Sequence, residues 1–317
     1  MSDSYSLAHF PVEIIEIICH QLARSDLARF MRTSKFLRKV GERILYRLTT
    51  KDRLQVMTWA GSRGQEATML QVLDDLLLRP IALVGPQILP CAAQGGCPEA
   101  LSRILAAGAD PNAKFNGSYP VLNAAAGQYP GCVEVVRLLL NKGANPYVID
   151  DGSRYNALHW AARTGNTAIM RILLDAGMDV DIAGLRDNTP LILAAKNGRY
   201  RACELLVGLG ADVNHVNEDE RSPLLYAAEA GVLSIVRLLL DHGADINFAR
   251  ATGKTALSIA AGRGDINIVE ALVNAGCDVN LKDWYGRRAI DYAISNGPCF
   301  PWSMVCEIIR SAPGFEL

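Results

Sequence analysis

The sequence predicts an all-α protein in which a solenoid of helix pairs follows a small module of three helices. Three observations support this prediction: a leucine position that recurs about every 33 residues, a glycine that recurs in the same phase, and an N-terminal stretch that follows neither pattern. The 317 residues are 50% hydrophobic and 21% charged, which lies in the globular range and excludes a mainly disordered chain.

The charge balance and the cysteines narrow the classes of partner and compartment. There are 32 Lys and Arg against 33 Asp and Glu, so the chain lacks the basic excess of nucleic-acid-binding proteins. No apolar run approaches the ~18 residues of a membrane span, and the acidic, polar start does not resemble a signal peptide. The eight cysteines are scattered without a Cys-x-x-Cys pair, which is typical of buried thiols in a reducing compartment. We therefore expect a cytoplasmic and/or nuclear protein that binds no metal, cofactor, nucleic acid or membrane.

Residues 1–49 predict three short helices. Pro11 suits the first position of a helix, and Ser25 or Asp26 and then Ser34 are candidate caps of two more. The first helix carries an apolar stripe at Ile14, Ile17, Ile18 and Leu22. Three short helices bury too little core to be stable alone, so we expect a partner or the adjoining repeats to support them.

The same stretch contains Phe10-Pro11, Asp26-Leu27, Ser34-Lys35 and Tyr46-Arg47 in one order. In this respect it resembles an F-box, except that Phe10 stands where leucine is usual. The resemblance implies that the module docks the Skp adaptor of Skp–cullin–F-box ubiquitin ligases, and so joins a cullin complex. The implied adaptor-binding residues are Pro11, Ile14, Ile15, Ile18, Leu22, Leu27 and Leu37. The alternative is a helical cap on the solenoid.

Residues 50–84 form a transition segment or a degenerate repeat. Met57, Ala60 and Gly64 lie in rough phase with the later repeats, but the register is lost by Asp74.

The repeats proper occupy residues 85–317. The recurring aliphatic residues are spaced 33, 36, 33, 33, 33 and 33 apart at Leu89, Leu122, Leu158, Leu191, Leu224, Leu257 and Ile290. The glycines in the same phase are Gly108, Gly143, Gly177, Gly210, Gly243 and Gly276. Words such as TPLILAAKNGR and LLLDHGADIN fill these units, and in them the chain resembles the ankyrin-repeat family. We expect about six to seven units, with the last as a C-terminal cap.

The residues within a unit have structural explanations. Thr189, Ser222 and Thr255 can cap the first helix of their units, and a proline follows the first two at a position that needs no N–H. Glycines such as Gly243 end the second helix in a left-handed conformation. The Asp residues at fixed phase predict turn hydrogen bonds rather than acid–base chemistry. Likewise, His159 predicts a hydrogen bond to neighbouring backbone.

No phosphate loop, HExxH or GxSxG motif occurs, and no nucleophile–base set converges in the sequence. The positions that the repeat leaves variable are the hairpin tips and those after each Ala pair. They form the predicted partner-binding groove, which comprises Tyr119, Tyr155, Arg163, Arg186, Lys196, Arg221, Lys254, Arg263, Trp284, Tyr285 and Arg287. Repeat geometry predicts that they align along one concave side, and Tyr, Trp and Arg are enriched at interface hot spots. The alternative is an ordinary solvated face.

The sequence therefore predicts a non-catalytic substrate receptor of a ubiquitin ligase, in which the F-box docks the adaptor and the groove holds an unknown protein substrate. We expect it to be monomeric outside that complex. The first alternative is an ankyrin scaffold with no link to a ligase. A third is an unconventional enzyme that uses the groove as a pocket.

Overall fold

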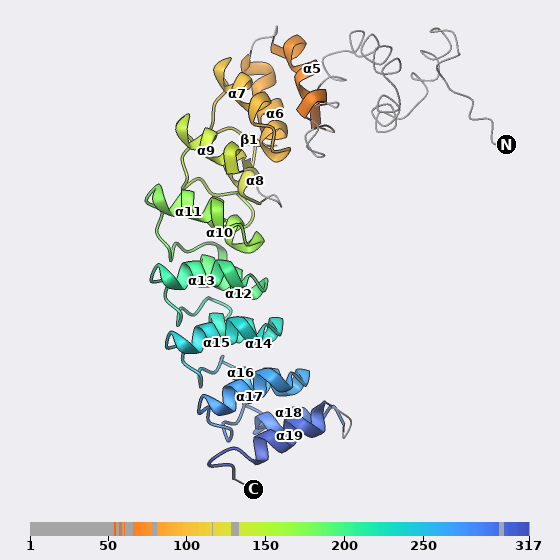
Figure 1. The fold of residues 1–317 in the computed structure, drawn as a ribbon, viewed down its shortest axis with the longest axis vertical. Helices are drawn as coiled ribbons and strands as arrows, with labels where there is room; N and C mark the ends of the chain where they lie inside the picture. The colour runs from red at the N-terminus through yellow and green to blue at the C-terminus, as the bar shows by residue number, and fades with distance from the viewer. Residues whose placement is uncertain are drawn as a thin grey trace, which may run out of the picture. The chain divides into compact units, whose positions relative to one another are not determined.

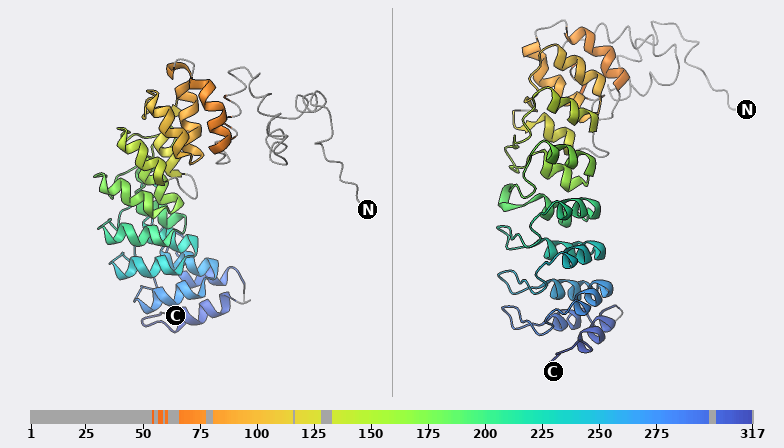
Figure 2. Two further views of the ribbon diagram at one scale, coloured as in Figure 1. Left: turned by 45° about the horizontal axis from the view of Figure 1, so that its top comes forward. Right: turned by 60° about the vertical axis from the view of Figure 1, so that its left-hand side comes forward.

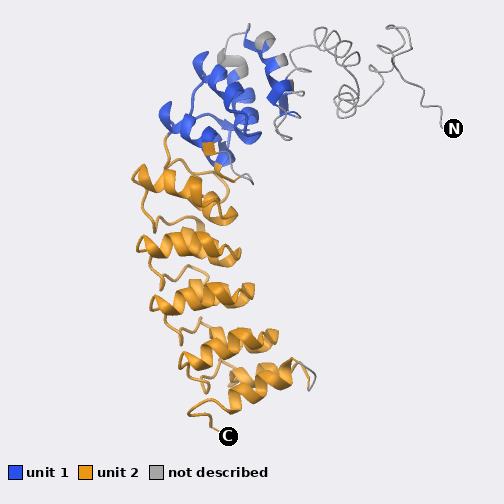
Figure 3. Ribbon diagram, viewed as in Figure 1, with its two compact units in different colours: residues 1–125, 134–144 blue, residues 126–133, 145–317 orange. Residues whose placement is uncertain are grey.

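A computed structural model describes residues 54, 57–58, 60, 66–77, 81–115, 117–127, 133–297 and 301–316. The predicted adaptor-binding residues, from Pro11 to Leu37, lie outside this part of the chain. The chain divides into unit 1, residues 1–125 and 134–144, and unit 2, residues 126–133 and 145–317 (Figure 3).

Unit 1 contains helices and one short β-hairpin. Its elements are α5 (Glu66–Leu77), α6 (Ile81–Gln94), α7 (Pro98–Ala106), β1 (Lys114–Phe115), β2 (Tyr119–Pro120) and most of α8 (Val121–Gly127) and α9 (Val133–Asn141). The strands are antiparallel, with Lys114 opposite Pro120 and Phe115 opposite Tyr119. This two-stranded sheet departs from the all-α prediction, because the link between two repeats is long enough here to pair with itself.

Unit 2 is built from helix pairs that repeat along the chain. Its helices are α10 (Ala157–Thr164), α11 (Thr167–Asp175), η2 (Leu185–Asp187), α12 (Pro190–Lys196), α13 (Tyr200–Gly208), α14 (Pro223–Ala230), α15 (Leu233–Asp241), α16 (Ala256–Arg263), α17 (Ile266–Asn274), α18 (Ala289–Ile294) and α19 (Trp302–Arg310). The first α-helix of each pair packs on the first of the next, from α10 to α18, and we call this line the first-helix row. The second helices, α11 to α19, form the second-helix row (Figures 1 and 2).

The predicted caps begin the helices of the first-helix row. Thr189, Ser222 and Thr255 each accept a hydrogen bond from the backbone N–H three residues later. Pro190 and Pro223 occupy the first turn, where the lost N–H has no cost. These predictions are confirmed.

Small buried side chains set the spacing within the first-helix row. The Ala pairs of α10, α12, α14 and α16 are all fully buried. Because alanine adds only one carbon beyond the backbone, successive helices approach closely and bury the repeated leucines between them. The second helix of each pair then ends at a glycine such as Gly243, which has a φ of +83° as predicted. No single pair could bury this surface alone, so each depends on its neighbours.

Side chains in the turns join each repeat to the next repeat along the chain. The predicted turn bonds are present: Asp212 Oδ1 accepts the N–H of Asn214 at 2.9 Å, and Asp245 Oδ1 accepts that of Asn247 at 3.0 Å. Asn214 also contacts the following repeat. Its Oδ1 accepts the N–H of Asp245 at 2.7 Å, and its Nδ2 donates to the carbonyl of Gly243 at 3.0 Å. We call this pattern the turn ladder.

Two steps of the turn ladder in unit 2 differ from that of Asn214. Tyr147 occupies the same repeat position and donates its hydroxyl to the carbonyl of Gly177 at 2.9 Å, and Asp181 stands where Asn214 stands one repeat later. Its two carboxylate oxygens accept the N–H of Asp212, both at 3.1 Å, but a carboxylate cannot donate to the carbonyl of Gly210. Burial raises the pKa of Asp181, and the nearby carboxylates of Asp179 and Asp212 raise it further.

We predict that Asp181→Asn raises the free energy of unfolding by about 1 kcal/mol, because it adds a donor for the Gly210 carbonyl and removes the repulsion. Urea unfolding followed by circular dichroism measures the change. The matched reciprocal, Asn214→Asp, should lower stability by a similar amount. An unchanged or less stable Asp181→Asn protein would contradict this account of the ladder.

The last hairpin is anchored by a buried carboxylate. Asp283 Oδ1 accepts the backbone N–H of Tyr285 at 2.9 Å and of Arg287 at 2.8 Å. Its Oδ2 accepts from Arg287 Nε at 3.0 Å and from the Tyr292 hydroxyl at 2.5 Å. Burial alone would raise the pKa of Asp283, but the hydrogen bonds from Tyr292 and Arg287 outweigh it and lower the pKa to about 2.

We predict that Asp283 stabilises the fold fully above about pH 4 and progressively less as the pH falls toward 2, because its pKa is lower in the folded than in the unfolded state. Asp283→Asn should therefore be less stable than wild type near neutral pH, with a difference that shrinks in acid. Urea unfolding of both proteins over this pH range tests this. A difference that stays constant down to the lowest pH would show that the carboxylate charge is not involved.

Candidate functional site

The first-helix row presents the predicted residues that follow the Ala pairs. Arg163, Lys196 and Arg263 are all exposed, as is Glu229 at the equivalent place on α14. The two alanines face the neighbouring helices, so the residues just beyond them turn outward. Arg163, Lys196 and Glu229 share one repeat position and therefore lie on one side of unit 2, whereas Gly262 fills this position on α16 and Arg263 follows it.

An aromatic residue lies under cations at every second repeat. Trp160, Tyr226 and Tyr292 each stand two positions after the recurring Leu or Ile of their unit, and aliphatic residues fill this position in the repeats between. Arg163 lies 5.0 Å from the Trp160 ring centroid. Such cation–π contacts contribute about 0.5–1 kcal/mol each at exposed sites.

The two tyrosines each receive cations from two successive repeats. Lys196 and Arg221 lie 5.2 and 5.3 Å from the Tyr226 ring centroid. Lys254 and Arg287 lie 4.8 and 4.5 Å from that of Tyr292. Five predicted groove residues, Arg163, Lys196, Arg221, Lys254 and Arg287, thus gather over three aromatic rings. Trp160, Tyr226 and Tyr292 are not among the predicted groove residues, although their spacing of two repeats was a readable signal.

A pocket of about 270 Å³ opens over α14, α16 and α18. Its cationic lining comes from Arg221, Arg250, Lys254 and Arg263, and the carboxylate of Glu229 also lines it. Glu229 forms an ion pair with Arg221, and Arg263 Nε lies 2.7 Å from Asp265 Oδ2. We call it the α16 pocket. Three of its cations were predicted, whereas Arg250 was missed.

Other predicted residues are used elsewhere. Arg186 forms an ion pair with Asp219 in the next hairpin at 2.8 Å. Tyr155 stacks on His159 at 5.0 Å between centroids and is only partly exposed. Tyr119 belongs to unit 1, in β2.

The hairpin before α18 exposes the two aromatic residues that the sequence singled out. Trp284 and Tyr285 are 77% and 79% exposed. The guanidinium of Arg287 lies 4.8 Å from the Tyr285 ring centroid, and the backbone N–H of Trp284 donates to the carbonyl of Thr252. Their backbone is thus held by the neighbouring hairpin while their side chains face solvent.

His159 has the predicted structural role. It is fully buried, its Nε2 lies 3.1 Å from the carbonyl oxygen of Asn188, and its ring also completes the capping box of α10 with Asn156. Burial lowers the pKa of His159 to about 4, so the ring is neutral near pH 7. With both nitrogens occupied by the fold, it is poorly placed to act as a base.

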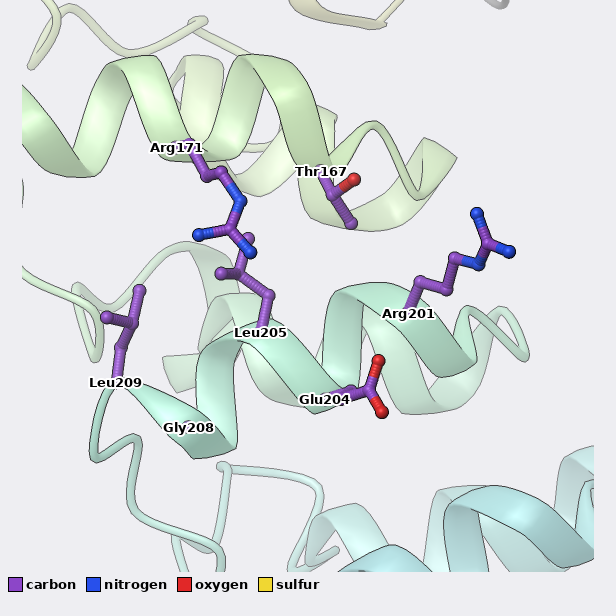
Figure 4. Close-up of a pocket in the computed structure, with 7 residues that line it drawn as sticks. All are labelled: Thr167, Arg171, Arg201, Glu204, Leu205, Gly208 and Leu209. Atoms are coloured by element: carbon purple, nitrogen blue, oxygen red, sulfur yellow. The ribbon is translucent and has the colours of Figure 1, made fainter.

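A second pocket, of about 420 Å³, lies between α11 and α13 of the second-helix row (Figure 4). Arg171 reaches from α11 beside Leu205 of α13, while Arg201 and Glu204 project from α13. Sequence reasoning missed this pocket, because its residues lie on helices whose outward face carries no repeated signal.

The described residues contain no group of three or more His, Cys, Asp or Glu side chains that could hold a metal ion. Within the same part of the chain, no helix is long and apolar enough to cross a membrane. Burial raises the pKa of Cys203 to about 12 and that of Cys277 to about 11, so both thiols stay protonated. Neither supplies a reactive thiolate.

Comparison with known proteins matches most of the chain to one family. The family model described as ankyrin repeats (3 copies) matches residues 89–184, 123–217, 182–250 and 224–302. A relative from Caenorhabditis elegans, the ankyrin repeat and KH domain-containing protein mask-1, is 37% identical over 31% of this chain and 4% of its own length. Palmitoyltransferase Hip14 of Drosophila melanogaster is 43% identical over 19% of this chain and 9% of its own length. The chain thus matches only a small part of these relatives.

Among solved structures, the ankyrin repeat domain of Bcl-3 superposes with a TM-score of 0.58 at 30% identity. The match covers 70% of this chain and 97% of that domain. The repeat spacing, the caps, the turn ladder and these matches agree, and the chain belongs to the ankyrin-repeat family.

Proposed function

We propose that this protein is a non-catalytic interaction scaffold whose protein partner binds along the first-helix row of unit 2. The observation that carries the proposal is the alternation of Trp160, Tyr226 and Tyr292, each covered by cations from exposed positions. Tyr, Trp and Arg supply most hot spots at protein interfaces.

The match to the ankyrin-repeat family supports the scaffold. Palmitoyltransferase Hip14 is named for an activity, but the match covers only 9% of its length. The buried, neutral His159 and the protonated thiols of Cys203 and Cys277 fit a chain that performs no chemistry of its own.

Site-specific photo-crosslinking in cells tests the proposal. With p-benzoylphenylalanine in place of Lys196, on the first-helix row, we expect a discrete crosslinked partner. With the same group in place of Arg201, on the second-helix row, we expect none.

Circular dichroism of both purified proteins controls for folding. Crosslinks from position 201 alone, or from neither position, would contradict partner binding on the first-helix row.

A second candidate function rests on the N-terminal sequence. We propose that residues 1–49 dock a Skp-type adaptor, which would make the scaffold a substrate receptor in a cullin complex. The support is the order of Phe10-Pro11, Asp26-Leu27, Ser34-Lys35 and Tyr46-Arg47 in the sequence. The ankyrin scaffold without a ligase is the better supported of the two, since it alone draws on the family match.

Co-purification with a Skp adaptor tests this second candidate. Wild type should capture the adaptor, and a variant with Pro11→Ala and Ile14→Asp should lose it, because both changes fall in the implied docking helix. Circular dichroism establishes that both proteins are folded. A folded wild type that captures no adaptor would remove the ligase link and leave the scaffold.

A further inference from the structure

The hairpin before α16 differs from its neighbours at the position whose side chain anchors the hairpin backbone. Asn217 and Asp283 stand seven residues before the recurring Leu or Ile, and both are buried. Asn217 Oδ1 accepts the backbone N–H of Arg221 at 3.0 Å, as Asp283 Oδ1 accepts that of Arg287 at 2.8 Å. Each side chain anchors its hairpin from within.

Arg250 occupies the equivalent position in the hairpin before α16. A guanidinium has no acceptor, so it cannot bind the backbone N–H groups that Asn217 and Asp283 hold. In the same hairpin, the buried hydroxyl of Thr252 has no hydrogen-bond partner. This hairpin has therefore lost an anchor that its neighbours keep.

Instead of anchoring its hairpin, the Arg250 side chain lines the α16 pocket. Among the described residues no carboxylate oxygen lies within 4.0 Å of the charged groups of Arg250 or Lys254, whereas Arg221 and Arg263 have acidic partners. The four cationic side chains that line the pocket outnumber the one carboxylate of its lining, that of Glu229. The pocket thus holds uncompensated positive charge at its centre.

Ser258 also lines the pocket, and the remaining lining residues are aliphatic, aromatic or glycine. Leu225, Ile259 and the ring of Tyr292 border the pocket, and Gly262 leaves it open on α16. A guanidinium and an ammonium favour carboxylates, which Arg can bind through two parallel hydrogen bonds. A free inorganic anion would leave the apolar wall uncovered, while a peptide can place an apolar side chain beside an acidic one.

We propose that the α16 pocket binds an acidic segment of a partner protein, with Arg250 and Lys254 holding a carboxylate and Ile259 and Tyr292 contacting an adjacent apolar side chain. This proposal rests on the proposed scaffold function and names the chemistry of its partner. It also accounts for Arg250, which contributes to binding but leaves its own hairpin without a side-chain acceptor for the backbone N–H groups.

Fluorescence anisotropy with the full-length chain tests the proposal. The probe is a fluorescein-labelled peptide of about ten residues in which Glu alternates with Leu, and the control peptide carries Gln in place of every Glu. We expect the Glu peptide to bind at least about tenfold more tightly than the Gln peptide, with an affinity that falls as salt rises.

Arg250→Asp separates binding from folding. Asp at this position can accept the N–H groups of the hairpin as Asp283 does, so the variant should melt at the same or a higher temperature than wild type. It should nevertheless bind the Glu peptide at least about tenfold more weakly. Lys254→Gln should also weaken binding. Arg201→Asp, the same change of charge on the second-helix row, should leave binding unchanged.

Wild-type affinity in Arg250→Asp, equal weakening in Arg201→Asp, or equal binding of the two peptides would overturn the proposal. The photo-crosslinking result is independent of this assay. If a partner crosslinks at position 196 of the chain that keeps Arg250 and the peptide assay gives one of these results, the scaffold function stands and the acidic-segment proposal fails. If no partner crosslinks at position 196 of the chain that keeps Arg250, the scaffold function itself fails.

Discussion

The turn ladder is the constraint on which the rest of unit 2 depends. A side chain such as Asn214 accepts the backbone N–H of Asp245 in the following unit and donates to the carbonyl of Gly243. The side-chain amide thereby links the backbones of two successive repeats, so the orientation of one repeat fixes that of the next. The buried Ala pairs of α10, α12, α14 and α16 then pack within the first-helix row.

Because successive repeats keep a fixed orientation, a residue type that recurs in the sequence also recurs along the surface. Once every unit repeats the same geometry, a residue at one repeat position always emerges on one face. Trp160, Tyr226 and Tyr292 can therefore form a spaced series, and Lys196 can reach the ring of Tyr226 in the next unit. Without the ladder these contacts would be isolated events.

Much of this fold could be predicted because the repeat signals are local. The caps at Thr189, Ser222 and Thr255, and the left-handed Gly243, are each determined by a few neighbouring residues. The hairpin of β1 and β2 was missed, because two-residue strands carry no periodic signal.

The site was less predictable, because it depends on contacts between units. Lys196 was a predicted groove residue, but its position over the ring of Tyr226 follows only from the way adjacent repeats pack. Arg250 was missed since a hairpin position that usually anchors the backbone gives no hint of lining a pocket. Arg186 was placed in the groove, yet its carboxylate partner, Asp219, comes from the next hairpin.

The carboxylate of Asp181 has a consequence for how the solenoid comes apart. In a linear array, each interface couples only two neighbours, so cooperativity breaks first at the weakest coupling. The step from Asp181 to Asp212 lacks one bond and gathers acidic groups. We therefore expect the solenoid to open more readily at this step than at that of Asn214, which would leave the repeats on its C-terminal side folded.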